Sequence, residues 1–455
     1  MTKSEEIALL KSTNSELNSK VESLEQKVMQ LLQIIEKQGV KKDSSNSSNP
    51  PSQDRGRHRN KSLRPKSTRK SGGQEGHKGT TLKMTETPDE TKILRSNYCA
   101  KCGSDLTALA HELISKRQEV IIPPIRPQIV EYQQLGCLCG CGHHQKADYP
   151  QGINAPIQFG GDVVALVSYF NVFQYVPYQR LKLLFEDVFN LSMSEGSIDN
   201  LLQRGARKAK PVYQVIFENI KQSKYIGSDE TGAKVNGEKF WIWVWQNLKN
   251  TFLKASKSRG FETIAAVFPE GLPDAIIGSD RWAAQLKITS AAKQLCFPHL
   301  MRELNYLIET EKTDWAQKFK DLLKESLDLK QISLASKKPF LCGEKQVSQV
   351  EDKLNKLLAF PIIKEHFPAT LTFQTQMLKN RNHLFTFLYH LEVPPDNNAS
   401  ERAIRNVKVK QKISGQFKSG QDAFCILRSV IDTLRKRQLN VLENLKIIMT
   451  SPIPE

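Results

Sequence analysis

The length, charge and composition of the chain exclude several classes of protein. Its 455 residues exceed what one core usually holds, so we expect about three structural units. The 66 Lys and Arg outnumber the 48 Asp and Glu, and the formal charge of +18 favours a polyanionic partner such as nucleic acid. No apolar run reaches the roughly 18 residues of a membrane span, and the N-terminus lacks a signal-peptide pattern. The sequence therefore predicts a cytoplasmic protein without a membrane partner.

Residues 1–38 are predicted to be a dimerisation helix. Leucines recur at every seventh position, and Ile, Val and one Asn fill the second position of the heptad: Leu10, Leu17, Leu24 and Leu31, with Ile7, Asn14, Val21, Val28 and Ile35. Branched residues at one core position and Leu at the other favour a parallel two-stranded coiled coil, and a single core Asn fixes its register. The alternative is an amphipathic helix packed on its own domain, but the next segment supplies no core.

Residues 39–90 are predicted to be a basic disordered linker. Between Lys41 and Lys83 there are 12 Lys or Arg and three acidic residues, a net charge of +9, which is half of the excess of the whole chain. A segment of this composition cannot bury enough apolar surface to fold alone. Its positive charge favours contact with DNA phosphates, although a solvated linker has the same composition.

Five of the eight cysteines are clustered, which in a cytosolic chain indicates a metal rather than disulfides. Cys99 and Cys102 form a CxxC pair, and a CLCGCG segment offers a second pair. We assign Cys139 and Cys141 to that pair, which completes a structural four-cysteine Zn²⁺ site in a domain over 91–152. The alternatives are reduced cysteines without a metal, or a ligand set that includes Cys137, His143 or His144.

Residues 153–222 are predicted to be a helical DNA-binding segment. Apolar periodicity indicates helices over 160–222, and Ser192 with Glu195 has the spacing of a capping box at the start of a basic helix. A helix, a short turn and a basic helix resemble a helix-turn-helix, although ordinary helical hairpins share this outline.

Acidic residues mark two predicted strands and one later helix. KYIGSDETG is predicted to be a short strand that ends in Asp229, and the Asn236-Gly237 turn predicts a three-stranded antiparallel meander. Asp280 ends the strand AIIGSD, and Glu401 lies on a helix in DNNASERAIR. Three carboxylates that meet at a sheet edge hold divalent cations for phosphoryl transfer. Acids are common at strand ends, and Asp396 is an alternative third acid.

Two further groups lie near these acids. Cys296 and His299 form a CxxH pair, which supplies only two metal ligands, so a structural or DNA-positioning role is favoured for His299 and Arg302. Asn398 is expected to cap the helix of Glu401. A basic run that is predicted to bind phosphate, rather than to be merely a solvated face, follows the last acid: Arg402, Arg405, Lys408, Lys410, Lys412 and Lys418.

The order of these motifs resembles a transposase of the insertion sequence 66 family. The zipper helix, the GGQEGHKG linker, the cysteine pairs, SDETGAKVNGEKFWIWVW, SDRW, CFPHLMRE and PPDNNASERAIR extend over nearly the whole chain. The resemblance implies an α/β ribonuclease-H-like catalytic domain over 223–420, with a helical insertion at about 305–390 and a C-terminal helical segment over 421–455. It assigns an Asp-Asp-Glu triad to Asp229, Asp280 and Glu401.

The resemblance also implies a function. A transposase would bind the ends of its insertion sequence, cut DNA with two Mg²⁺ (or Mn²⁺) ions at the triad, and join the freed 3′-hydroxyl to target DNA. Homodimers or larger oligomers, companion proteins of the element and a place on the bacterial nucleoid are expected with it. The rival interpretations are a non-catalytic zinc-and-zipper DNA-binding regulator, a decayed transposase, and a nuclease that cuts without joining.

Overall fold

The computed structural model describes residues 3–39, 42–43, 46–47, 76 and 82–451, with the side chains of the first helix described over 13–31. Most of the predicted basic linker lies outside these residues. The chain forms two units, one over 1–61, 129–187 and 191–455, and the other over 62–128 with 188–190. None of the described helices is long and apolar enough to span a bilayer.

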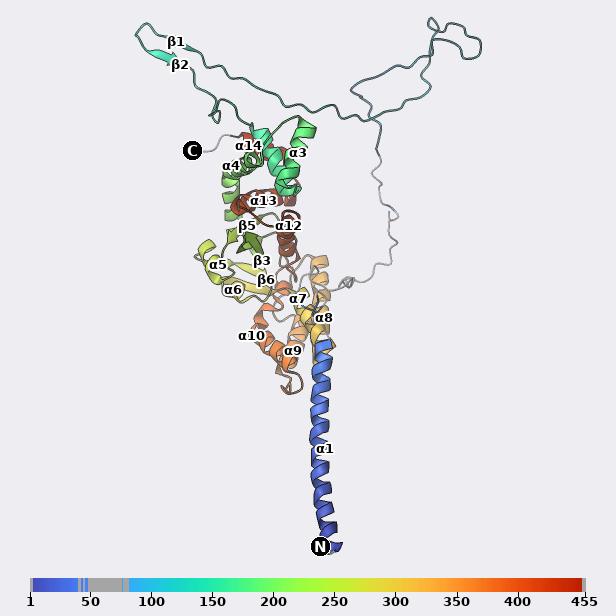
Figure 1. Ribbon diagram of the computed structural model, residues 1–455, viewed down its shortest axis with the longest axis vertical. Helices are drawn as coiled ribbons and strands as arrows, with labels where there is room; N and C mark the ends of the chain where they lie inside the picture. The colour runs from blue at the N-terminus through green and yellow to red at the C-terminus, as the bar shows by residue number, and fades with distance from the viewer. Residues whose placement is uncertain (1–2, 40–41, 44–45, 48–75, 77–81, 452–455) are drawn as a thin grey trace. The chain divides into compact units, whose positions relative to one another are not determined.

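A five-stranded mixed sheet is the centre of the larger unit (Figure 1). Its strand order is β5-β4-β3-β6-β7. The strands are β3 (Tyr225–Val235), β4 (Glu238–Gln246), β5 (Thr251–Ser256), β6 (Leu272–Ser279) and β7 (Ser290–Leu295). The first three strands are antiparallel neighbours, whereas β6 pairs parallel to β3 and β7 pairs parallel to β6. The parallel register sets Gly227 beside Gly278, so the C-terminal end of β6 lies next to the first half of β3.

The antiparallel half forms as its sequence predicts. Asn236 and Gly237 both have positive φ angles, 47° and 82°, which gives the two-residue turn that matches the twist of a hairpin. Trp243 and Trp245 are buried, with stacked rings 5.8 Å apart, and they pack inside rather than stand as an exposed surface for bases. The predicted three-stranded meander is therefore confirmed.

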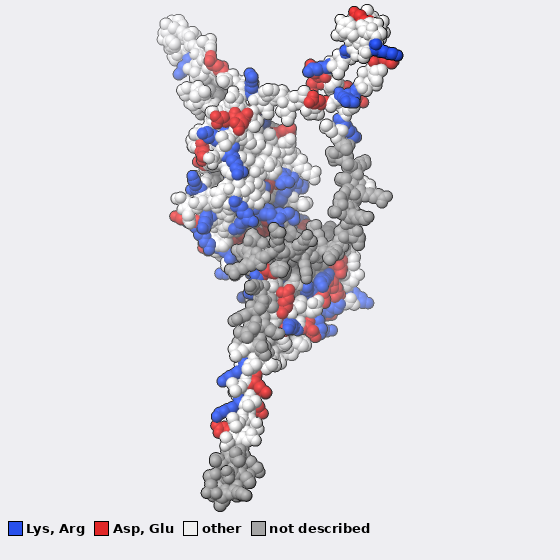
Figure 2. Space-filling model, turned by 45° about the vertical axis from the view of Figure 1, so that its right-hand side comes forward, with Lys and Arg blue, Asp and Glu red and all other residues white. Residues whose placement is uncertain are grey.

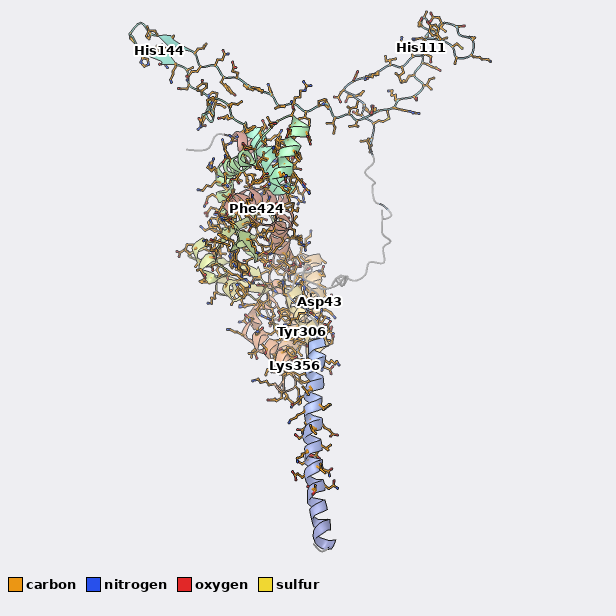
Figure 3. The ribbon with its side chains drawn as sticks, viewed as in Figure 1. Asp43, His111, His144, Tyr306, Lys356 and Phe424 are labelled. Carbon is orange, nitrogen blue, oxygen red and sulfur yellow. The ribbon has the colours of Figure 1, made fainter. Side chains whose placement is uncertain are left out.

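Helices cover the sheet and its outer edge. Helix α12 (Asn398–Ser414) packs on β3 and β4, and α13 (Gln421–Lys436) packs on β5 together with α4 (Glu195–Lys221). Two backbone N–H groups of the edge strand β5 are satisfied by α13, because Thr251 N donates to Thr433 Oγ1 and Leu253 N donates to Ser429 Oγ. An edge strand covered in this way offers no free ladder to another chain. Phe424 of α13 lies among these helices (Figure 3).

A group of helices precedes the sheet. It consists of α2 (Gly161–Ser168), the π-helix η2 (Tyr169–Phe173), α3 (Tyr178–Phe189) and α4, joined by α14 (Val441–Thr450) from the C-terminus. A Cβ atom on Gly161 would lie 2.8 Å from Met449 O, so only glycine permits this contact between α2 and α14. The predicted capping box is wrong in its position: Ser194 caps α4 and accepts from Ser197 N, whereas Ser192 lies outside the helix.

A helical insertion follows β7. It contains α7 (Phe297–Glu311), α8 (Asp314–Ser336), α9 (Lys345–Ala359), α10 (Pro368–Lys379), η3 (Arg381–His383) and α11 (Thr386–Tyr389). All of these except η3 contribute to one apolar cluster. Lys330 on α8 is buried and donates to the carbonyl oxygens of Phe387, His390 and Leu391. These hydrogen bonds attach the C-terminal end of α11 and the residues after it to α8.

Shorter or separate elements complete the described chain. Helix α1 (Lys3–Gly39) carries the predicted heptad, and its seam residues within the described range are exposed. Strands β1 (Gly136–Leu138) and β2 (His144–Lys146) form a small antiparallel hairpin. Helices α5 (Phe261–Val267) and α6 (Ala283–Leu286) flank β6 in the sequence.

Candidate active site

The three predicted acids come from three neighbouring elements. Asp229 lies within β3, Asp280 directly follows its parallel neighbour β6, and Glu401 lies in the first turn of α12, which packs on β3. The negative charges of Asp280 and Glu401 both raise the pKa of the Asp229 carboxyl. The structure therefore places the three predicted acids on neighbouring elements, and their joint action as a triad stays a prediction.

Asp229 lies in β3 with a partly exposed side chain. Burial raises the pKa of its carboxyl well above the ordinary value, and the negative charges of Asp280, Glu230 and Glu401 raise it further. A hydrogen bond from Glu230 N to Asp229 Oδ1, 2.9 Å long, partly opposes this shift. Carboxylates that repel one another at close range are stabilised by a shared cation, which is the electrostatic condition for a divalent metal site.

Asp280 is fixed by the chain that follows it. Its Oδ1 accepts a 2.9 Å hydrogen bond from Trp282 N, which closes a tight turn after β6. The indole Nε1 of Trp282 donates to Arg259 O, and its ring lies 3.7 Å from the guanidinium carbon of Arg259. The orientation of Asp280 thus depends on the contact between Trp282 and Arg259.

Arg259 links the surroundings of the two aspartates. Its guanidinium lies between the rings of Trp241 and Trp282 and contacts Glu230 Oε1 at 2.8 Å through both Nε and Nη2. Gln285 Nε2 donates to the other carboxylate oxygen of Glu230. Glu230 directly follows Asp229, so the guanidinium joins the strand of one aspartate to the turn of the other. Sequence analysis missed this contact, because nothing in the spacing of these residues indicates it.

Helix α12 is held against β3 by a close contact at its N-terminus. A Cβ atom on Gly227 would lie 2.5 Å from Gln246 Nε2 and 2.6 Å from Ser400 Oγ. Asn397 Nδ2 donates to Ser228 O over 2.6 Å. Glu401 follows directly after this contact, so the glycine in β3 sets how near its helix approaches Asp229.

The turn before α12 bears on two predictions, namely the residue that caps the helix and Asp396 as an alternative third acid. The helix cap is Asn397, not Asn398, because Asn398 is the first helical residue and its side chain does not occupy the cap. Asp396 Oδ1 accepts from Asn398 N at 2.9 Å, so this carboxylate is engaged by the turn. Glu401, by contrast, acts on the ionisation of Asp229.

The CxxH pair lies beside Glu401. Ligand atoms of Cys296, His299 and Glu401 all lie within 4.8 Å of one another, and His299 Nδ1 is 3.8 Å from Glu401 Oε1. Burial lowers the pKa of His299, although the Glu401 carboxylate opposes this change, and burial raises the pKa of the Cys296 thiol. The sequence offered only two ligands here, since the third lies more than 100 residues further along the chain.

The predicted basic run divides into two groups on α12. Arg402, Arg405, Lys408 and Lys412 are exposed, and the last three lie on the same helix face as Glu401. Lys410 is only 8% exposed and donates to Asn171 Oδ1, so its predicted contact with DNA does not fit its position. The physical reason is that Lys410 lies on the buried face of α12, opposite the exposed stripe formed by Arg405, Lys408 and Lys412.

On the face shown in Figure 2, Lys and Arg side chains gather in a band across the core. Lys408, on the exposed side of α12, also donates to Gly232 O at 2.8 Å, which ties its amine to β3. Because Lys408 is held against β3 in this way, Arg405 and Lys412 are the exposed cations on the Glu401 face of α12 that are most available to a phosphate.

Each of the two cysteine pairs lies in a turn that a glycine N–H closes, and the pairs belong to separate units. Gly103 N donates to Cys99 O, and Gly142 N donates to Cys139 O, each over 2.8 Å, with positive φ at both glycines. Hydrogen bonds from Ser104 lower the pKa of Cys102 to about 7, and those from Cys141 lower the pKa of Cys139. Each turn therefore contains one thiol whose lowered pKa favours the thiolate that a metal binds. The joint four-cysteine site stays a prediction.

The neighbours of the second turn explain why other ligands were considered. Cys137 lies in β1 opposite Gln145, and His144 begins β2 (Figure 3). Cys139 N donates to His143 O, which closes the turn between the two strands. The turn that contains Cys139 and Cys141 is thus the part of this hairpin that resembles the first cysteine pair.

Comparison with known families gives two matches. The family described as Transposase IS66 family matches residues 156–424, more than half of the chain, and this range contains all three acids. A family of unknown function (DUF6444) matches residues 2–83. A search of curated proteins finds no match.

Proposed function

The chain belongs to the IS66 transposase family, and from this membership we propose that it cuts DNA at the ends of its element and joins them to target DNA. Asp229, Asp280 and Glu401 are the proposed catalytic residues. The observation that supports this proposal is that β3, β6 and α12, which carry the three acids, are neighbours although long stretches of sequence separate them. A protein that only binds DNA gains nothing from acids at this position, because carboxylates repel phosphate.

The three carboxylates fit the divalent cations that this chemistry needs. Glu401 Oε1 is buried without a hydrogen-bond partner among the described residues. Burial and the neighbouring negative charges disfavour the ionised form of Asp229, and a bound cation would stabilise that form. Carboxylate oxygens are the ligands that Mg²⁺ and Mn²⁺ prefer. When bound, a pair of such ions activates a nucleophile and stabilises the leaving oxygen in phosphoryl transfer.

The protein positions these ligands through its own contacts. Trp282 N holds Asp280, Glu230 N holds Asp229, and the close contact at Gly227 holds the helix of Glu401. Ligands fixed in this way need little reorganisation when the substrate arrives, which is the main protein contribution to catalysis by metal positioning.

The exposed stripe on α12 suits the path of the DNA strand. Arg405, Lys408 and Lys412 follow Glu401 at intervals that keep them on one helix face, which extends about 16 Å over 11 residues. Cations on this line can neutralise successive phosphates and place one phosphate at the acids. We therefore include the stripe in the DNA-binding surface and leave Lys410 out of it.

We infer a ribonuclease-H-like catalytic core from the same sheet. Three antiparallel strands followed by two parallel ones, with acids on the central strand and its parallel neighbour, support this inference. The insertion observed between β7 and α12 agrees with the helical insertion that the family resemblance implies.

We infer dimerisation through α1 and a structural Zn²⁺ at the cysteine pairs. The seam residues Leu17, Val21, Leu24, Val28 and Leu31 are each more than half exposed in the single chain. A second copy of the helix would bury them as a coiled coil. In the zinc-binding segment, the lowered pKa of Cys102 supports thiolate ligands.

Strand cleavage by the purified protein tests the proposal. The substrate is the native DNA that flanks the gene, with Mg²⁺ present, and the variants are Asp280→Asn and the control Asp274→Asn. Both aspartates belong to the β6 region, but Asp274 is exposed on the strand. We expect cleavage and joining to be lost only in Asp280→Asn, with DNA binding retained. Equal cleavage by both variants would refute the assignment, and cutting without joined products would favour a nuclease.

A further inference from the structure

We propose that Cys296, His299 and Glu401 form a binding site for one Zn²⁺ or a similar borderline divalent cation, and that its occupancy withdraws Glu401 from the triad and inhibits DNA cleavage. The site itself stands on the geometry of these residues, whereas the inhibition rests on the proposed function. None of the structural zinc ligands predicted from the sequence takes part.

The first two ligands come from one helix end. Cys296 is the N-cap residue of α7, and His299 lies in its first turn, so the side chains are on the same side of the helix, one turn apart. Cys296 is 2% exposed, and its Sγ accepts from Asn397 N at 3.2 Å. That contact joins the N-terminus of α7 to the N-terminus of α12.

The third ligand enters from α12. Glu401 lies one turn beyond Asn397, and its Oε1 is 3.8 Å from His299 Nδ1. Tetrahedral zinc with bonds of about 2.0–2.3 Å separates neighbouring ligand atoms by about 3.3–3.8 Å. The three ligand atoms lie within 4.8 Å of one another, so a closure of at most about 1.5 Å, which side-chain rotation supplies, completes the geometry.

Two of the three ligand atoms lack partners that would compete with a metal. His299 Nδ1 and Glu401 Oε1 are both buried, and neither has a hydrogen-bond partner among the residues that the structure describes. A buried polar atom without a partner destabilises the folded protein. Metal coordination at this point satisfies both atoms at once.

The donor set selects a different metal from that of the triad. A thiolate and an imidazole favour zinc and similar ions, whereas Mg²⁺ prefers oxygen ligands alone. Three protein ligands leave the fourth zinc position for water. On binding, the Cys296 thiol loses its proton to solvent and becomes a thiolate, which the N-terminus of α7 stabilises.

Zinc at this site acts on the triad through Glu401. The oxygen nearest to His299 is the buried Oε1 of the same carboxylate that is proposed to hold Mg²⁺ near Asp229. Coordination to zinc turns the carboxylate toward α7, and a second cation so close repels Mg²⁺. The same residue therefore belongs to an active and an inhibited arrangement.

The zinc content of the full-length chain tests the site without any activity assay. Wild type, Cys296→Ser and Cys425→Ser are dialysed against the same buffered zinc solution and measured by atomic emission. Cys425 is the matched control, because it is also a buried thiol (1% exposed) on a helix, but in α13. We expect Cys296→Ser to hold one zinc fewer per chain than wild type and Cys425→Ser. The predicted cysteine pairs are intact in all three proteins and contribute equally.

A second variant covers the chance that the first fails to fold. His299→Gln changes a partly exposed side chain, and circular dichroism checks that both variants retain the wild-type helix content. We expect His299→Gln to lack the same zinc. An unchanged zinc content in either folded variant overturns the proposed site.

Inhibition is measured separately. At fixed Mg²⁺, zinc is titrated into the cleavage reaction of wild type and Cys296→Ser, and the variant is expected to need at least tenfold more zinc for half inhibition. Equal inhibition of both proteins overturns the regulatory half of the proposal. If wild type does not cleave at all, the proposed function fails, while the difference in zinc content still decides whether the site exists.

Discussion

Replacing Asp229 by Asn is expected to stabilise the metal-free protein, although it removes a proposed catalytic ligand. Burial and three neighbouring carboxylates raise the pKa of Asp229 above its ordinary value of 3.8. A carboxyl with a raised folded-state pKa contributes stability that is fully present below the ordinary value and is lost as pH rises toward the raised one. Asparagine keeps an oxygen that can accept from Glu230 N, but it has no charge to bury.

The size of this effect follows from proton linkage. Within the window above 3.8, each pH unit lowers the unfolding free energy of wild type by up to about 1.4 kcal/mol relative to Asp229→Asn. The measurement is urea unfolding in chelator at a series of pH values, followed by the fluorescence of the buried Trp243 and Trp245. In Mg²⁺ at ten times its dissociation constant, wild type alone gains about 1.4 kcal/mol.

A matched variant separates this mechanism from a general effect of removing an acid. Asp274→Asn neutralises an exposed carboxyl of β6 and is expected to follow the pH dependence of wild type. Parallel pH profiles for wild type and Asp229→Asn in chelator would refute the reasoning, because they would show that the Asp229 carboxylate is not destabilised in the folded state.

Two further substitutions test the contacts that position the acids. Gly227→Ala is expected to displace α12, to cost about 1–3 kcal/mol of stability and to lower cleavage at least tenfold, because its Cβ overlaps side chains from β4 and α12. Gly232→Ala in the same strand, whose Cβ approaches only the Trp241 ring at 3.9 Å, should leave both unchanged; equal losses would contradict the contact. Arg259→Lys removes a planar group from between two indoles and is expected to raise the Mg²⁺ concentration for half-maximal cleavage, measured by titration, whereas an unchanged requirement would show that the guanidinium does not position the acids.

Local patterns in the sequence were sufficient to predict the meander. Asn236-Gly237 specifies a hairpin through backbone conformation alone, and the alternating pattern after it specifies a strand. Both signals act over a few residues, so no knowledge of the tertiary structure is needed. The same signals predicted the end of β6 next to Asp280, but the predicted end of the first strand at Asp229 was wrong, because β3 continues to Val235.

Helix caps and long-range clusters were harder to predict. Several polar residues near a helix start can serve as its cap: Ser194 caps α4 through its side chain, whereas Asn397 takes the N-cap position of α12 while its side chain donates to Ser228 O instead. The CxxH pair lacked a third ligand in the sequence because Glu401 comes from a helix beyond the insertion. Glu401 comes close to the pair only because the start of α7 packs against the start of α12. No short sequence pattern indicates a contact between segments so far apart in the chain.

The burial of Lys410 has a similar cause. A run of cations along a helix indicates charge but not which face packs, because the apolar residues of α12 are interspersed with Lys and Arg. The helical period of 3.6 residues, counted from Glu401, separates Arg405 and Lys412 on its own face from Lys410 on the opposite face. The division of the basic run is therefore contained in the spacing of its residues, whereas the choice of the buried face depends on tertiary packing.

Mobility of the element in cells tests the central claim most directly. A donor plasmid carries the gene's native flanking DNA around a marker, and the protein is supplied as wild type, Asp280→Asn or Asp274→Asn. The account predicts transfer of the marker with wild type and Asp274→Asn, and a loss to background with Asp280→Asn at equal protein level. Equal transfer by all three proteins would contradict the triad, and no transfer by any of them would contradict an active transposase.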